Sequence, residues 1–116
     1  MNPVQLDREL IDEIKQVERV TGQSNLFSGF VSQLEGSLAE FRPTFSDCVA
    51  RGDTNGAARA AHTLLGACRQ LGARELSDLF AAIEGSAKAG DYAEAQRKFD
   101  AGAQLIAQSL EALKRA

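Results

Sequence analysis

Residues 54–72, with the sequence TNGAARAAHTLLGACRQLG, decide how this chain folds. Apolar side chains recur in this stretch at intervals of four and three residues, which is the spacing of one buried helix face. Asp53 or Thr54 can cap the start of the helix, and Gly72 can end it in a left-handed conformation. We therefore predict a helix over residues 54–71, whose core face consists of Ala57, Ala61, Leu64, Cys68 and Leu71.

His62, the only histidine of the chain, lies in the middle of this helix. At roughly 100° of rotation per residue, it falls about 140° from the centre of the apolar face, with Gly66 near 180° and Arg69 near 120°. A lone histidine is often a hydrogen-bonded core residue, but this spacing predicts that His62 faces outwards. An ordinary surface histidine remains the alternative.

Four further helices follow from the same periodicity, at residues 7–20, 25–51, 74–89 and 91–114. Pro43 interrupts the second helix without changing the phase of its apolar residues, which favours a kink over a boundary. Short turns join consecutive helices and require antiparallel neighbours. We predict one all-α domain over residues 1–116, an up-down antiparallel four-helix bundle with an additional N-terminal helix laid across one end.

Composition excludes several classes of function. Asp and Glu total 16 against 13 Lys and Arg, and no basic stripe occurs, so we expect no nucleic-acid binding. No apolar run approaches the ~20 residues that span a bilayer, and the N-terminal segment lacks the layout of a signal peptide. We expect a cytoplasmic protein without direct membrane contact. Cys48 and Cys68 fall on or beside apolar helix faces as free thiols, and we assign no metal.

Several short motifs lie in a characteristic order around the histidine. They are Gly52-Asp53, Ala61-His62-Thr63-Leu64-Leu65-Gly66, Leu71-Gly72-Ala73, Leu76, Leu79, Ile83-Glu84 and Gly90-Asp91. This order resembles the histidine-containing phosphotransfer (HPt) domain family of two-component phosphorelays, and the resemblance runs from about Leu26 to the C-terminus.

The resemblance implies signal transduction by a four-helix bundle in which His62 accepts and donates a phosphoryl group as a phosphohistidine. The implied partners are receiver (response-regulator) domains and a hybrid sensor histidine kinase, with Mg²⁺ bound by the receiver. The chemistry agrees, because imidazole has an unperturbed pKa of about 6.5 and is a nucleophile near neutral pH. The chain has no Gly-x-x-x-x-Gly-Lys-Ser/Thr loop and no glycine-rich nucleotide lid, so we expect a phosphoryl carrier without its own ATP site or cofactor.

The neighbours of His62 supply the expected docking residues. Gly66 has no side chain to obstruct a partner. The family usually has lysine where this chain has Leu65, and Arg59 and Arg69 could provide positive charge on the same broad face instead. Leu65 could also form an apolar docking patch with Ala58.

Two other functions stay open at this point. One is an HPt-like scaffold that binds a receiver or kinase without phosphotransfer, which the change to Leu65 motivates. The other is a generic helical interaction bundle, although this explains neither Gly66 nor the two Gly-Asp turns. The sequence also leaves open whether Met1 begins a free-standing protein or a domain from the C-terminal end of a hybrid kinase. We expect a monomer.

Overall fold

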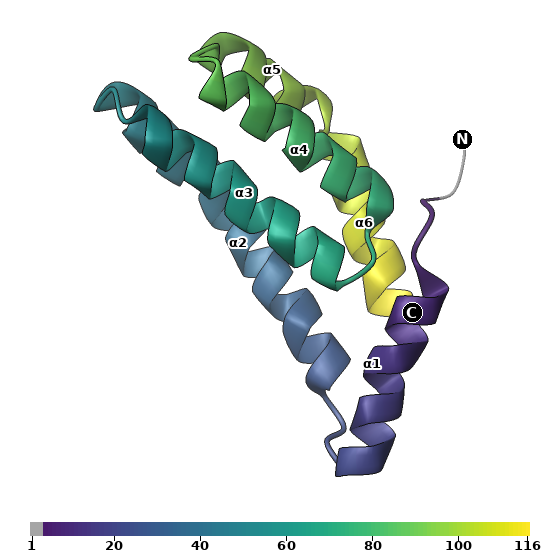
Figure 1. Ribbon diagram of the computed structural model, residues 1–116. Helices are drawn as coiled ribbons and strands as arrows, with labels where there is room; N and C mark the ends of the chain where they lie inside the picture. Colours follow the sequence, from purple (N-terminus) through teal and green to yellow (C-terminus); the bar gives the residue numbers. More distant parts are fainter. Residues whose placement is uncertain (1–3) are drawn as a thin grey trace.

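Six α-helices account for most of residues 4–116, the part of the chain that this computed structural model describes (Figure 1). No strand occurs in that part, where Leu6 and Ala73 form an isolated antiparallel bridge. The expected all-α class is confirmed. Residues 1–3 lie outside the described part, and with them Pro3 and the start of the segment compared above with a signal peptide. The helices are α1 (Arg8–Thr21), α2 (Leu26–Ala50), α3 (Thr54–Gln70), α4 (Arg74–Lys88), α5 (Tyr92–Ala101) and α6 (Ala103–Arg115).

Both ends of α3 lie where the sequence places them. The carboxylate of Asp53 accepts the backbone N–H of Gly56 at 2.8 Å and caps the helix. Gly72 follows the helix with a φ of 72°, a conformation that glycine adopts without the steric cost of a Cβ. A Cβ at position 72 would also lie 2.8 Å from the Cβ of Asp7, whose N–H donates to the Gly72 carbonyl. Glycine therefore lets the N-terminal segment close on the α3–α4 turn.

Pro43 lies inside α2, which continues from Leu26 to Ala50. The prediction of one helix across the proline is confirmed. Pro43 and Ala39, four residues earlier, are both exposed. The carbonyl of Ala39 that loses its helical partner is thus on the solvent side, where water can replace the missing N–H.

The predicted single helix over residues 91–114 is wrong, because the chain breaks at Gly102 into α5 and α6. Gly102 is buried, and a Cβ there would lie 2.6 Å from Cδ2 of Leu79 on α4. The break occurs where the backbone approaches Leu79 of α4 too closely for a side chain to fit without a shift. The apolar periodicity of the sequence continues through residue 102. It therefore gives no sign of the contact with Leu79, which forms only in the tertiary structure.

The third helix lies at the centre of the packing, with α2 on one side and α4 on the other, and α4 also packs against α5. The short turns between α2, α3, α4 and α5 make consecutive helices antiparallel, as Figure 1 shows. Phe41 joins these layers, because its ring centroid lies 5.4 Å from that of Phe80 on α4 and 4.8 Å from that of Phe99 on α5. α1 packs against α2. The remaining face of α3 is left open to solvent.

Candidate functional site

His62 lies on the open face of α3, and 65% of its side chain is exposed. The core face of the same helix is buried, including Ala57, Ala61, Leu64 and Cys68. The prediction that His62 points outwards is confirmed. A partner can therefore reach the imidazole ring without any change in the packing of the bundle.

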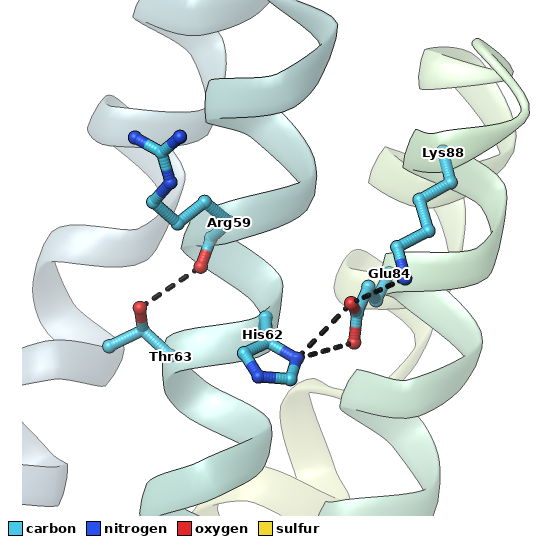
Figure 2. A network of polar contacts seen from close by, with 5 residues as sticks. All are labelled: Arg59, His62, Thr63, Glu84 and Lys88. Carbon is cyan, nitrogen blue, oxygen red and sulfur yellow. Dashed lines mark hydrogen bonds and ion pairs between the residues drawn. The ribbon is translucent and has the colours of Figure 1, made fainter.

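Glu84 of α4 contacts the imidazole ring of His62. Its two carboxylate oxygens each lie 3.2 Å from Nδ1 of His62. Figure 2 marks both contacts with dashed lines. An ionised carboxylate can only accept hydrogen bonds, so in the neutral ring Nδ1 carries the proton and Nε2 carries the free lone pair. The contact thus selects the tautomer in which Nε2 is unprotonated and its lone pair is free.

The Glu84 side chain is only 12% exposed. Glu84 belongs to one of the motifs that match the family, but the sequence alone indicates no role for it. A signal was present: Glu84 lies four residues after Phe80 and one after Ile83, both buried, so a charged residue occupies the apolar face of α4. Buried carboxylates are uncommon unless they are paired, which makes such a residue a candidate for a site.

Lys88 also binds Glu84, with its Nζ 3.1 Å from Oε2 (Figure 2). Burial alone raises the pKa of the Glu84 carboxyl, but the hydrogen bonds from Lys88 and His62, together with their charges, outweigh it and hold that pKa below its usual value of 4.5. Glu84 is therefore ionised at neutral pH and can accept a hydrogen bond from Nδ1–H of His62.

Three of the expected docking residues are exposed as predicted, namely Arg59, Gly66 and Arg69. A Cβ at Gly66 would meet nothing within 4 Å, so the surface one turn beyond His62 is open. The guanidinium of Arg59 extends away from the ring in Figure 2, and its backbone carbonyl accepts the hydroxyl of Thr63 at 3.0 Å. Among residues 4–116, neither arginine forms an ion pair.

The expected apolar docking patch of Ala58 and Leu65 is wrong. Ala58 is 8% exposed and Leu65 is 5% exposed, and both belong to the hydrophobic core. Since α3 packs against α2 and α4 together, its buried stripe is wider than the face inferred from a single row of residues. Position 65, where the family usually has lysine, thus faces the interior of this protein.

A shallow groove between α2 and α3 lies beside the histidine. It consists of two hollows of about 280 and 170 Å³ that share Ser37 and Thr63, the residue next to His62. The first hollow is lined by Phe30, Gln33, Leu34, Ser37, Thr63, Ala67, Gln70 and Leu71, and the second by Ser37, Glu40, Phe41, Thr44, Ala60, Thr63 and Leu64.

The two cysteines lie in the core as free thiols. Burial raises the pKa of Cys68 to about 12, so this thiol stays protonated and behaves as a small apolar side chain. Within the described residues, no group of three or more His, Cys, Asp or Glu side chains is arranged to hold a metal ion.

Comparison with known proteins identifies the family. The family model of the Hpt domain matches residues 26–116, which is most of the chain. Searches of curated proteins and of solved structures returned no match. No helix of the described residues has the length and hydropathy needed to cross a membrane. The chain therefore belongs to the Hpt domain family, whose members carry out histidine phosphotransfer in two-component phosphorelays.

Proposed function

We propose that His62 accepts a phosphoryl group from the aspartyl phosphate of a receiver domain, or of a hybrid sensor kinase, and passes it to the aspartate of another receiver. The observation that carries this proposal is the pairing of Nδ1 with Glu84, which leaves Nε2 of a largely exposed ring as the nucleophile. Helices α2, α3, α4 and α5–α6 would form the four-helix bundle that presents this ring to the partner.

The transfer step follows from the roles of these atoms. The lone pair on Nε2 attacks phosphorus, the bond between phosphorus and the aspartate oxygen breaks, and the aspartate leaves as a carboxylate. The new phosphohistidine carries its positive charge on the ring, and Glu84 stabilises that charge through the Nδ1 proton. The reverse sequence of steps delivers the phosphoryl group to the next aspartate. Mg²⁺, bound by the receiver, would neutralise charge on the transferring group.

We further propose that the receiver docks over His62 and Gly66 and along the groove between α2 and α3. The walls of the groove are apolar and polar, with Glu40 as the one charged residue among the lining residues, and the groove adjoins His62 through Thr63. Arg59 and Arg69 are exposed on the same helix and have no ion-pair partner within the described part of the chain, so they are available to acidic groups on the rim of a receiver.

A second candidate function is docking without transfer. The observation that favours it is the buried Leu65, which leaves no cation at the position where the family usually has lysine. Both candidates predict binding to a receiver or kinase, and only the first predicts a covalent product on His62.

The deciding experiment offers this protein a panel of ³²P-labelled phosphorylated receivers and hybrid kinases, with His62→Gln as the control. Phosphotransfer predicts label on the wild type that is acid-labile and alkali-stable, and no label on the variant. Binding of the same partners by both proteins, with label on neither, would instead support the docking scaffold.

A further inference from the structure

We infer that Lys88 is a positioning residue for phosphotransfer, which acts on His62 by sharing the Glu84 carboxylate with it. The inference rests on the proposed function of His62. Oε2 of Glu84 lies 3.1 Å from Nζ of Lys88 and 3.2 Å from Nδ1 of His62, so the two nitrogens are no more than about 6.3 Å apart, the sum of those distances. One carboxylate thus bridges a permanent cation and the nucleophilic ring (Figure 2).

This ion pair differs from the other pairs at the same helical spacing. Arg51–Asp47 and Arg115–Glu111 join side chains that are all at least 60% exposed, and such pairs contribute little. Glu84 is 12% exposed and is the only charged residue among the buried polar residues of the described part. Solvent screens charges less at such a poorly exposed carboxylate than in bulk water. The charge of Lys88 therefore affects the electrostatic potential at the His62 ring.

The charge balance gives the direction of the effect. His62 must be neutral to attack phosphorus, because protonation of Nε2 removes the lone pair. A nearly buried carboxylate that faced the ring alone would favour the imidazolium form. Lys88 neutralises part of that charge and also repels a second cation. Lys88 therefore leaves Glu84 able to accept the hydrogen bond from Nδ1–H of His62, and it also disfavours protonation of Nε2.

Other charges around the junction do not compete for this role. On α3, Arg59 extends away from Glu84 in Figure 2, and Arg69 is two turns beyond His62. From α5, Nζ of Lys98 donates to the hydroxyl of Ser86 at 2.8 Å. Lys88 is the one lysine or arginine in the described residues that forms an ion pair with Glu84.

The test is an NMR titration of the intact protein combined with the pH profile of phosphoryl uptake. Since His62 is the only histidine, its ring signals need no assignment by mutation. Lys88→Met should move the midpoint of the ring titration to higher pH by about half a unit to one unit. The acid limb of the uptake rate should move with it, so that uptake below the midpoint falls about three- to tenfold.

Two variants serve as controls. Lys88→Arg keeps the positive charge, so its titration midpoint and its pH profile of uptake should match those of the wild type. Lys114→Met removes an equal charge from an exposed pair with Glu35 on other helices, and should move neither. Far-UV circular dichroism and urea unfolding establish that each variant is folded.

A midpoint that moves no further in Lys88→Met than in Lys114→Met would overturn the inference. A midpoint that moves while the uptake profile stays in place would also overturn it, because Lys88 would then tune the ring without affecting transfer. Absence of label on the wild type at every pH would instead overturn the proposed function, and the titration would still report whether Lys88 controls the ring.

Discussion

Nδ1 of His62 on α3 lies 3.2 Å from each carboxylate oxygen of Glu84 on α4, although 22 residues separate the two in the chain. The carboxylate orients the ring and specifies which nitrogen is free. The histidine that the sequence singles out and the carboxylate that orients its ring therefore come from different helices. Their alignment depends on the packing of α3 against α4.

Glu84→Gln should lower the rate of phosphoryl uptake by about tenfold or more, since the amide can donate to Nδ1 and so favour the tautomer with its proton on Nε2. Uptake of label from a phosphorylated receiver, followed over time, measures the rate. Glu111→Gln, in an exposed pair with Arg115, is the matched control and should leave the rate unchanged. Equal rates in the two variants would show that the carboxylate has no part in transfer.

The same carboxylate makes stability depend on pH. The pKa of Glu84 lies below 4.5 in the folded protein, so the folded state binds its proton less readily than the unfolded state. The resulting stabilisation is fully present above about pH 5 and is lost as the pH falls through the folded pKa. Urea unfolding should show that wild type loses more stability than Glu84→Gln between pH 6 and pH 3.5. A constant difference between them would contradict the pairing.

Substitutions at Gly66 should separate access from stability. Gly66→Ala should stabilise the helix by up to about 1 kcal/mol, because a Cβ there meets nothing within 4 Å. Gly66→Gln should keep most of that stability but slow phosphoryl uptake, because its longer side chain stands one turn from His62. Gly29→Gln is the control, since Gly29 is equally open and does not line the groove. Thermal unfolding and uptake rates measure the two effects, and unimpaired uptake in Gly66→Gln would place docking elsewhere.

Restoring the lysine typical of the family should not improve this protein. Leu65→Lys places an ammonium at a position that is 5% exposed, and we expect a loss of about 2 to 4 kcal/mol in the free energy of unfolding. Leu65→Met, which nearly conserves volume, should cost less than about 1.5 kcal/mol. Chemical denaturation of both variants makes the comparison, and a lysine variant as stable as the methionine variant would show that position 65 reaches solvent.

Much of this protein follows from its sequence because the information is local. The 3.6-residue period and the turn chemistry of Asp53 and Gly72 place the helices, and the phase of the apolar face turns His62 outwards. The motifs around His62 identify the Hpt family, which the match over residues 26–116 confirms. These features depend on residues within a few turns of one another.

Only the tertiary structure decided which side chains meet. The close approach of Leu79 to Gly102 accompanies the break in the last helix, and packing of α3 on two sides buries Leu65. The partnership of Glu84 with His62 depends on the register of two helices that pack against each other. A periodic pattern specifies which face of each helix is buried, but not how far one helix is displaced along the other. Local sequence thus turned His62 outwards, and helix packing determined the carboxylate that orients its ring.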